Sequence, residues 1–321
     1  MEQSSLKPVW LLTDGNAGNL RQAEALAAAL GMEATCLPAL EPRAPWRWLA
    51  PRRLPGARAG LGPDLAARLA RGPVPALAIG CGRQGALATR LARELGARSV
   101  QILDPRIATR HWDLVVAPAH DRLRGDNVIT LLGSLNPVDE AWLERARRSF
   151  RALDALPGPR TALLVGGPTR HAPWTAQMLS TVLDALRARV RDEGGSLLAT
   201  VSRRTPAALS APLHAAMQGL PGLLWDGEGG GANPYPGLLA CADRIVCTPD
   251  SVNMLSEACA TGAPVHVIAP ELARGRAAGF LRALLDLGRV RPLDPALEPF
   301  PVRPLRETAR VAAEVRQRLN L

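Results

Sequence analysis

Residues 244–270, RIVCTPDSVNMLSEACATGAPVHVIAP, combine polar side chains with the expected start of a helix. The pattern predicts a strand ending at Cys247, a turn ending at Ser251 and a helix over residues 252–260. A helix N-terminus that follows a parallel strand offers free N–H groups and a partial positive charge, which suit a phosphate or diphosphate. Glu257 lies far enough along this helix to reach a ribose hydroxyl. The alternative is an ordinary strand–helix–strand unit, in which Ser251 only caps the helix and Glu257 is solvated.

Two Gly-rich turns in the first half of the chain follow expected strands in the same way. Residues 14–19, DGNAGN, come after a strand over residues 9–12, and residues 80–84, GCGRQ, come after a strand over residues 76–79. Glycine allows the backbone to approach an anion closely. Residues 14–19 do not match the pattern GxGxxG, and residues 80–85, GCGRQG, have its letters but not in the right place. The chain has neither GxxxxGK followed by Ser or Thr nor GxSxG. These observations argue against a classical dinucleotide site, a P-loop and an α/β-hydrolase.

Short apolar strands alternate with helices along the chain, which predicts parallel, doubly wound sheets. Leu156-Pro157-Gly158-Pro159 separates two such series. We therefore expect an α/β protein with two Rossmann-like domains facing a cleft, residues 1–155 and 156–302. Residues 303–321 are expected to form a basic amphipathic helix that packs back on the first domain. Its apolar stripe would consist of Leu305, Val311, Val315 and Leu319.

The balance of charge points to an acidic partner. The chain has 321 residues, a net charge of +10 and a pI of about 10.8. Such a charge favours nucleic acid, anionic lipid or a phosphorylated substrate. The arginines are spread along the chain without interleaved aromatic residues, and no helix-turn-helix, zinc-finger or aromatic RNA-binding pattern is present. We therefore expect no nucleic acid, but a phosphorylated small molecule and an anionic membrane surface as partners.

Cysteine and histidine spacing gives no metal-binding pattern, so we expect no metal. The five cysteines lack CxxC spacing and lie mostly in apolar segments, as reduced thiols of a cytosolic protein do. The five histidines are far apart, and none lies in HExxH. The first residues lack the features of a signal peptide, and no apolar run reaches the ~18 residues of a membrane span. The expected location is cytoplasmic, with peripheral association at the inner face of a membrane.

Residues 42–63 are rich in Pro, Arg and Trp and are expected to form an irregular loop. Trp46 and Trp48 lie in this segment. They either face a membrane or an acceptor, or they pack the loop onto its domain.

Six segments of the chain, taken in order, match a known family. They are TDGNAGNLRQAEALAAALG, IGCGRQGALATRLARELG, QILDPR, VVAPAHD, LLVGGPTRHAPW and CTPDSVNMLSEACATGAPV, and they extend over nearly the whole chain. Together they resemble the mitochondrial fission Elm family, which is grouped with GT-B-type glycosyltransferases. The last segment is also similar to the donor-binding segment of the GlcNAc transferase that makes lipid II, in which a Cys-ended strand leads to a helix with Glu and a following Gly. Here these are Cys247, Glu257 and Gly262, after a slightly longer turn that contains Pro249-Asp250 instead of small residues.

The resemblance implies that the second domain binds a nucleotide-sugar donor and that the first domain holds the acceptor. Ser251 and neighbouring amides would bind the diphosphate, and Glu257 the ribose. The other donor-side candidates are Gly166, Gly167, Arg170, Ser202, Arg203 and Asn253; the acceptor-side candidates are Gly15, Asn16, Gly18, Gly82, Arg83 and Gln84. An inverting transferase needs a base near the acceptor hydroxyl, and Asp14 and His120 are the best-placed candidates, with His171 in the second domain. For each of these three, a structural role as turn former or helix cap is the alternative.

The function implied is sugar transfer from a nucleotide-sugar to a cell-envelope acceptor. The nucleotide-sugar is a substrate, so no separate cofactor is expected, and the absence of a DxD motif fits the metal-independent habit of GT-B enzymes. Two alternatives remain open. One is a nucleotide-sugar epimerase of the same fold, which requires carboxylates in the cleft and no acceptor. The other is a non-catalytic adaptor, because plant relatives are linked to recruitment of the division machinery.

Overall fold

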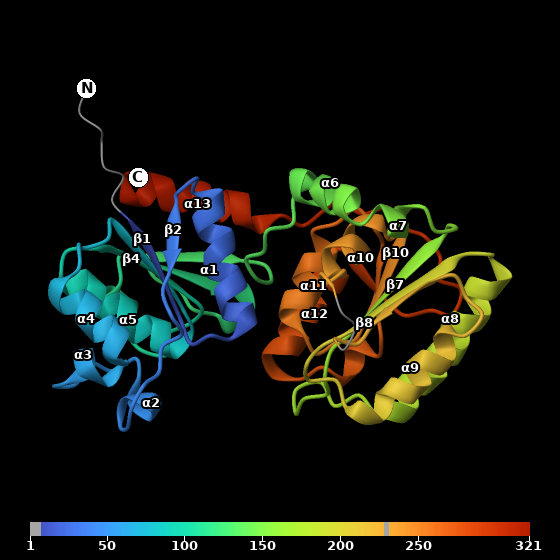
Figure 1. The fold of residues 1–321 in the computed structure, drawn as a ribbon, viewed down its shortest axis with the longest axis horizontal. Coiled ribbons are helices and arrows are strands. Elements are labelled where there is room, and N and C mark those ends of the chain that lie inside the picture. Colours follow the sequence, from blue (N-terminus) through green and yellow to red (C-terminus); the bar gives the residue numbers. More distant parts are fainter. Residues whose placement is uncertain (1–7, 228–230) are drawn as a thin grey trace. The chain divides into compact units, whose positions relative to one another are not determined.

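The computed structural model describes residues 8–227 and 231–321. Contacts within the chain divide it into two units (Figure 1). Unit 1 consists of the chain up to Pro137 together with Glu307–Leu321, and unit 2 is Val138–Arg306. Each unit contains a six-stranded parallel sheet, so the expected α/β class with two Rossmann-like sheets is confirmed.

The sheet of unit 1 has the order β2-β1-β3-β4-β5-β6. Its strands are β1 (Val9–Thr13), β2 (Ala34–Cys36), β3 (Leu77–Cys81), β4 (Arg98–Ile102), β5 (Leu114–Pro118) and β6 (Val128–Leu131). Every residue of β1, β3 and β5 is buried, as expected for parallel strands covered on both faces. Thr13 of β1 pairs with Cys81 of β3. These two central strands therefore end level with each other.

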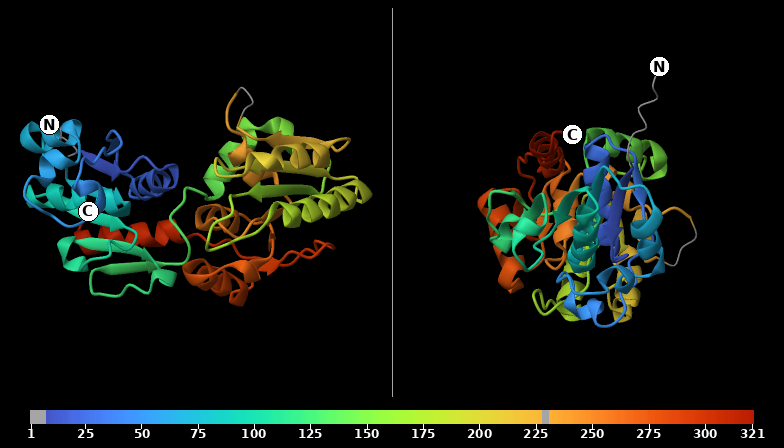
Figure 2. Two further views of the ribbon diagram at one scale, coloured as in Figure 1. Left: turned by 90° about the horizontal axis from the view of Figure 1, so that it is seen from below. Right: turned by 90° about the vertical axis from the view of Figure 1, so that its left-hand side faces the viewer.

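Helices cover both faces of this sheet (Figures 1 and 2). They are α1 (Ala17–Ala29), α2 (Trp46–Leu49), α3 (Ala57–Gly60), α4 (Pro63–Arg71), α5 (Gly82–Glu94) and α13 (Glu307–Leu319). α1 and α13 pack on one face, where Leu26, Val311 and Val315 join the strands in one apolar core. α4 and α5 cover the other face with α3. The C-terminal helix is also tied to the end of β6, because the N–H of Leu132 donates to Oε2 of Glu307 (3.1 Å).

The sheet of unit 2 has the order β12-β11-β10-β7-β8-β9. Its strands are β7 (Arg160–Val165), β8 (Ser196–Val201), β9 (Gly222–Trp225), β10 (Arg244–Cys247), β11 (Val265–Val267) and β12 (Val290–Pro292). The central pair, β7 and β10, is in register from Arg244 and Thr161 to Cys247 and Leu164. This pair places the turns after β7 and β10 side by side.

Unit 2 is also covered on both faces. Its helices are α6 (Glu140–Ser149), α7 (Arg151–Asp154), α8 (Ala176–Asp192), α9 (Ser210–Met217), α10 (Tyr235–Cys241), α11 (Val252–Cys259) and α12 (Gly275–Asp286). α8 and α9 pack on one face, where Leu183 and Leu213 contact the core formed by Leu163 and Leu197. α10, α11 and α12 lie on the other side of the strands (Figure 1).

Residues 138–155 belong to unit 2, whereas the sequence analysis places them in the first domain. The reason is the packing of α6 and α7 on α10. The aromatic side chain of Phe150 lies directly against Gly237 of α10, where a Cβ atom would come within 2.6 Å of the Phe150 Cβ. This contact depends on a residue far along the chain, so the local pattern did not contain it.

Among the helices of the described residues, none has both the length and the apolar composition needed to cross a bilayer. α8, with 17 residues, has Arg189 and Arg191 in its last turn.

Candidate functional site

Each sheet has one point at which the order of the strands reverses. In unit 1 the chain passes from β1 to β2 on one side and then to β3 on the other. In unit 2 it passes from β7 through β8 to β9, and then to β10 on the opposite side of β7. Ligands of open α/β sheets bind beyond the carboxyl ends of the strands at such a switch point. The candidate sites are therefore the end of β1 beside β3, and the end of β7 beside β10.

At the switch point of unit 2, two threonines fix the turn after β7. Gly166 donates its N–H to Oγ1 of Thr248, the buried residue after β10, over 2.8 Å. Thr205, in the turn after β8, donates its hydroxyl to the carbonyl of Gly166 over 2.6 Å. Residues from the ends of three strands thus hold one short segment in place.

The carboxylate of Asp250 holds the same segment. Its side chain is fully buried, and Oδ2 accepts the N–H of Gly167 (3.0 Å) while Oδ1 accepts the indole N–H of Trp174 (2.9 Å). Nη2 of Arg204, whose side chain is 58% exposed, lies 3.4 Å from Oδ2. A buried carboxylate is costly unless donors surround it. These four residues therefore form one network in which the carboxylate is satisfied by the protein.

Both glycines after β7 are required by this network. A Cβ atom on Gly166 would lie 2.1 Å from Oδ2 of Asp250, and one on Gly167 would lie 2.3 Å from the carbonyl oxygen of Arg204. The sequence analysis placed these glycines on the donor side and attributed such glycines to the close approach of a bound anion. The anion that approaches Gly166 in this structure is the protein's own Asp250 carboxylate. Their part in donor binding stays a prediction.

Helix α11 begins at this switch point. Oγ of Ser251 accepts the N–H of Met254 at 3.4 Å, so Ser251 caps the helix. Glu257 is only 2% exposed, and the hydroxyl of Tyr235 donates to its Oε2 over 2.6 Å. The alternative in which Glu257 is solvated is therefore wrong. A ribose that binds Oε2 of this carboxylate competes with the Tyr235 hydroxyl.

Three further donor-side candidates lie close to this network in the chain. Ser202 follows β8, and its Oγ accepts the N–H of Arg204 (3.2 Å). Arg203 is exposed beside it, and Asn253 is half-buried in the first turn of α11. The guanidinium of Arg203 is therefore accessible to an anion at the carboxyl edge of the sheet of unit 2.

Arg170 and His171 lie in the loop between β7 and α8, and both are exposed. Nε of Arg170 donates to Nε2 of His171 over 3.0 Å. The N–H of Arg274 donates to the carbonyl of His171 (2.7 Å), which ties this loop to the start of α12. The histidine is therefore held by neighbours of unit 2, and its part in proton transfer stays a prediction.

At the switch point of unit 1, the carboxylate of Asp14 is half-buried. Oδ1 accepts from Nδ2 of Asn19 (2.9 Å), and Oδ2 accepts from Nδ2 of Asn16 (2.8 Å). Gly82, with a φ of +78°, lies beside them, because a Cβ atom there would come within 2.8 Å of Nδ2 of Asn19 and 3.7 Å of Oδ2 of Asp14. The ends of β1 and β3 thus bring a predicted catalytic residue and two predicted acceptor-side residues together.

The other acceptor-side candidates flank these residues. Gly15 and Arg83 are exposed, and Gly18 and Gln84 are half-buried. Gly15 has a φ of +77°, and a Cβ atom there would lie 2.9 Å from the Cβ of Ala39. The turn after β1 therefore packs on the segment that follows β2.

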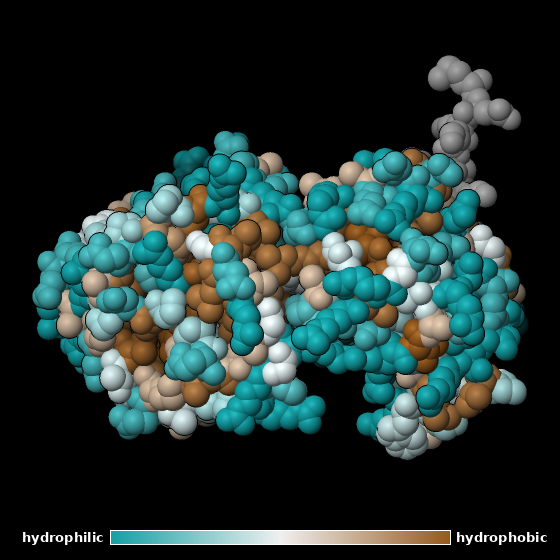
Figure 3. All heavy atoms as spheres, turned by 180° about the vertical axis from the view of Figure 1, so that it is seen from behind, coloured by the Kyte–Doolittle hydropathy of each residue, from teal (hydrophilic) through white to brown (hydrophobic). Residues whose placement is uncertain are grey.

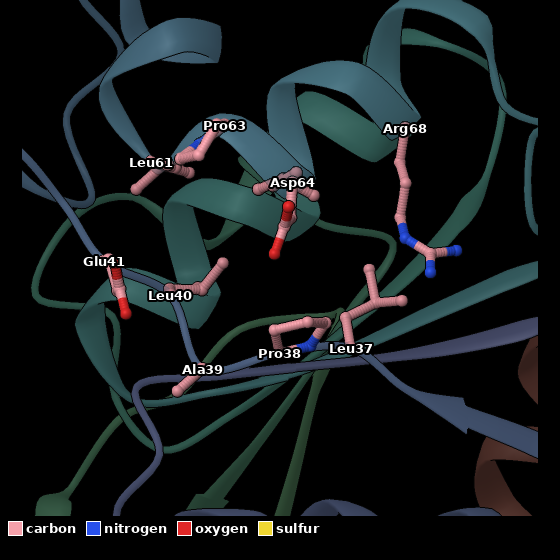
Figure 4. A pocket seen from close by; sticks show the side chains of 11 residues that line it. Leu37, Pro38, Ala39, Leu40, Glu41, Leu61, Pro63, Asp64 and Arg68 are labelled. Carbon is pink, nitrogen blue, oxygen red and sulfur yellow. The ribbon is translucent and has the colours of Figure 1, made fainter.

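A small cavity lies between that segment and the start of α4 (Figure 4). Its volume is about 120 Å³. It is lined by apolar side chains, among them Leu37, Leu40 and Leu65, with the polar groups of Glu41 and Asp64. Pockets for small-molecule ligands measure roughly 300–1,000 Å³, so this cavity does not hold a nucleotide-sugar.

His120 lies in a second polar group of unit 1, after β5. Burial lowers the pKa of His120, although Asp121 opposes that shift. Burial likewise raises the pKa of Asp121, against the opposing effect of His120 and Arg106. Arg106 is itself paired with Asp104, with 3.2 Å between Nη1 and Oδ2. A neutral imidazole at neutral pH can accept a proton.

The two candidate bases lie apart. Asp14 follows β1 and His120 follows β5, and β3 and β4 separate these strands. Three strand spacings amount to about 14 Å, so the two side chains cannot act on the same hydroxyl.

Cys81, at the end of β3, is fully buried, and burial raises the pKa of its thiol, which keeps it protonated and unreactive. Within residues 8–227 and 231–321, no three His, Cys, Asp or Glu side chains are grouped as metal ligands would be.

Sequence reasoning missed the partners of three carboxylates, Asp14, Asp250 and Glu257. Asn19, Trp174 and Tyr235 were not singled out, although each donates a hydrogen bond to a carboxylate at a switch point. Asn19 follows Asp14 closely enough to be suspected from the repeated Asn in DGNAGN. Trp174 and Tyr235 are far in sequence from Asp250 and Glu257, so no local pattern indicated them.

Comparison with known families identifies the chain. The family model described as "Mitochondrial fission ELM1" matches residues 17–319. The "Mitochondrial fission protein ELM1" of Arabidopsis thaliana is 30% identical over 276 residues, which cover 76% of this chain and 64% of that protein. The chain thus spans less than two thirds of the length of that relative. It belongs to the mitochondrial fission ELM1 family.

Solved structures define the class of fold. The UDP-GlcNAc 2-epimerase from Neisseria meningitidis, solved with bound UDP-GlcNAc, has a TM-score of 0.56 at 12% identity, covering 98% of this chain and 99% of that chain. A glycosyltransferase from Rickettsia africae has a TM-score of 0.50 at 11% identity, covering 98% of this chain and 88% of that chain. The fold is therefore that of GT-B glycosyltransferases and related epimerases. Identities this low establish the fold alone.

Proposed function

We propose that this chain transfers a sugar from a nucleotide-sugar to a cell-envelope acceptor. The observation that carries the proposal is the meeting, at the switch point of unit 2, of the capped N-terminus of α11, the Gly166-Gly167 turn and Glu257. Amides at a helix N-terminus suit a diphosphate, and a carboxylate suits ribose hydroxyls. Support also comes from the fold, since related structures include one solved with UDP-GlcNAc.

In the proposed reaction, the acceptor oxygen attacks C1 of the sugar. The bond between C1 and the phosphate oxygen breaks, and the nucleoside diphosphate leaves with the electron pair. A base in unit 1 takes the hydroxyl proton. Asp14 is the first candidate, because its carboxylate is half-buried at a switch point. His120 is the second, because burial lowers its pKa and keeps the imidazole neutral.

A nucleotide-sugar epimerase is the second candidate function. The observation that favours it is the number of carboxylates at the carboxyl edge of the sheet in unit 1, where Asp14, Asp104 and Asp121 follow β1, β4 and β5. An epimerase needs groups that remove and return protons on the sugar, and it needs no acceptor. Product formed from donor alone separates it from a transferase.

The test is a thermal-shift screen with UDP-, GDP- and CMP-linked sugars. A ligand that binds only the native state at about a hundred times its Kd stabilises it by about 2.7 kcal/mol. We expect one nucleotide class to raise the melting temperature. Glu257→Gln should abolish that shift, whereas Glu298→Gln, a change at an exposed position of unit 2, should retain it.

Tyr235→Phe adds a second readout. Its hydroxyl is a competitor for Glu257, so its loss should leave the shift intact or enlarge it. Absence of any shift with the wild-type protein would overturn the donor proposal and leave the adaptor function.

We further propose that the protein associates peripherally with the inner face of a membrane, supported by its net charge of +10.

A further inference from the structure

The segment before α4 exposes an unusual combination of side chains. Residues 42–63 contain five arginines and no acidic residue, and all five arginines are exposed. Of its two tryptophans, Trp46 packs on Gly60, where a Cβ atom would lie 2.3 Å from Cδ2 of the indole. Trp48 is 64% exposed, and Leu54 is 39% exposed. Figure 3 shows apolar and weakly polar atoms at the end of unit 1 that carries α2.

Next to this segment is an open pocket of about 460 Å³. It lies at the amino ends of β4 and β5, since it is lined by Arg98, which begins β4, and by Asp113, which precedes β5. Arg90 and Arg93 of α5 complete its basic lining, with Glu94 beside them. Three arginines and two carboxylates thus surround an opening that faces away from the switch point of this unit.

Direct contacts join the segment to the pocket. Nη1 of Arg90 donates to the carbonyl of Pro51 over 2.6 Å. Arg53 pairs with Glu94, and Nη2 of Arg58 lies 4.0 Å from the same carboxylate. The two features are therefore one surface. We call it the basic surface and define it by Trp48, Arg52, Arg53, Leu54, Arg58, Arg90, Arg93 and Arg98.

Positive charge on the basic surface is only partly neutralised. Six arginines face two carboxylates, of which Glu94 is shared by two arginines and Asp113 pairs with Arg93. Within the described part of the chain, no ion pair involves Arg52 or Arg98. Burial and the charges of Arg90, Arg110 and Arg93 lower the pKa of His111 at the same pocket, which is consistent with a positive potential there.

We propose that the basic surface binds an anionic phospholipid bilayer. Clustered arginines attract the negative headgroups of such a membrane, and exposed Trp is the side chain that settles at the headgroup level. Charge and an apolar anchor together provide the two contributions that stable peripheral binding requires. The proposal deepens the membrane part of the proposed function and does not depend on the donor chemistry.

The test is sedimentation with vesicles of equimolar phosphatidylcholine and phosphatidylglycerol, compared with phosphatidylcholine alone. We expect binding only to the anionic vesicles, with steep loss as salt rises. Each arginine removed should lower the partition coefficient about fivefold. The variant that combines Arg52→Glu with Arg98→Glu should therefore lose at least 25-fold by the same rule.

A matched control changes net charge equally at another place. Arg145→Glu with Arg191→Glu alters two exposed arginines of unit 2 that have no ion pair in the described residues, and it should bind nearly as well as the wild type. Trp48→Ala should weaken binding with little change in salt dependence, whereas Leu287→Ala, at a residue 62% exposed in unit 2, should not.

Three results would overturn the proposal. One is no preference for anionic vesicles, and another is equal loss in the test and control variants. The third is displacement by inorganic phosphate that exceeds displacement by chloride at the same ionic strength, which would indicate a site for free phosphate. Thermal shifts with nucleotide-sugars on the Trp48→Ala variant and on the variant that combines Arg52→Glu with Arg98→Glu keep the outcomes separate, because these altered residues lie outside unit 2.

Discussion

Each of the two switch points carries an aspartate directly after or near the end of a central strand. The two carboxylates differ in burial and in their hydrogen-bond partners. In unit 2, the side chain of Asp250 is fully buried and is surrounded by Gly167, Trp174 and Arg204. In unit 1, Asp14 is half-buried and bonds only to side chains and a backbone amide of its own turn. One carboxylate is a part of the framework, and the other is accessible to a ligand.

In the proposed function, this difference divides the work between the units. The diphosphate would bind at the edge of unit 2, where the buried carboxylate already holds the turn after β7 and Arg204 in place, so the edge is preorganised for binding. At unit 1, the available carboxylate is suited to accept a proton. The predictions below test this division, from the largest expected effect to the smallest.

Asp250→Ala should destabilise the protein by about 3 kcal/mol, because it leaves buried donors of Gly167 and Trp174 without an acceptor. Asp14→Ala should cost less than about 1 kcal/mol, since its donors remain hydrated. Urea unfolding of each variant measures the two values. Asp250→Asn, which retains one oxygen acceptor, should fall between them. Equal costs for the two alanine variants would remove the distinction between the two switch points.

Asp14→Asn should lower the turnover of the nucleotide-sugar about a hundredfold, the lower end of the effect of a general base, without loss of stability. The asparagine keeps the size of the side chain and its acceptor oxygen but cannot take a proton. The matched variant is Asp64→Asn, at an exposed carboxylate of the same unit. Unchanged turnover in Asp14→Asn, with a loss in His120→Gln, would transfer the role of base to His120.

Gly166→Ala should cost about 2 kcal/mol, because the new Cβ atom would lie 2.1 Å from Oδ2 of Asp250. In the Asp250→Ala background the same change should cost much less, since the clashing oxygen is gone. A double-mutant cycle in urea measures this coupling. Additive effects would mean that Gly166 is needed for a reason other than the buried carboxylate.

Stability should fall as the pH drops below 6.5, the ordinary value for histidine. Burial, together with Arg244 and Arg291, lowers the pKa of His266 in unit 2, and burial lowers that of His120 in unit 1. The unfolded chain therefore binds protons that the folded chain does not, so acid favours unfolding. His266 is 2% exposed and His120 is half-buried. Melting curves should lose more of this pH dependence in His266→Gln than in His120→Gln.

The fold was predictable because each part of it has a local pattern. The apolar strands β1, β7 and β10 and the turns that follow them were read from short windows of sequence, and the amphipathic spacing of Val311, Val315 and Leu319 indicated the last helix. The prediction was wrong for Leu305, which precedes α13 and belongs to unit 2, where its N–H donates to the carbonyl of Cys259. The candidate site was predictable only in part. Residues at strand ends such as Asp14, Gly82 and Gly166 could be named, because the carboxyl ends of parallel strands share one edge of a sheet. Their exposure and their partners could not be named.

By itself, the sequence determined the α/β class, the family and the edge of each sheet at which polar residues gather, since these depend on periodicity and on neighbours close in the chain. Only the tertiary structure decided that the side chain of Asp250 is fully buried while Asp14 is half-buried. It also decided that Glu257 accepts a hydrogen bond from Tyr235, and that Trp48 is exposed while Trp46 packs on Gly60. Burial and hydrogen bonding depend on residues that lie far apart in the chain and meet only when the sheet has formed.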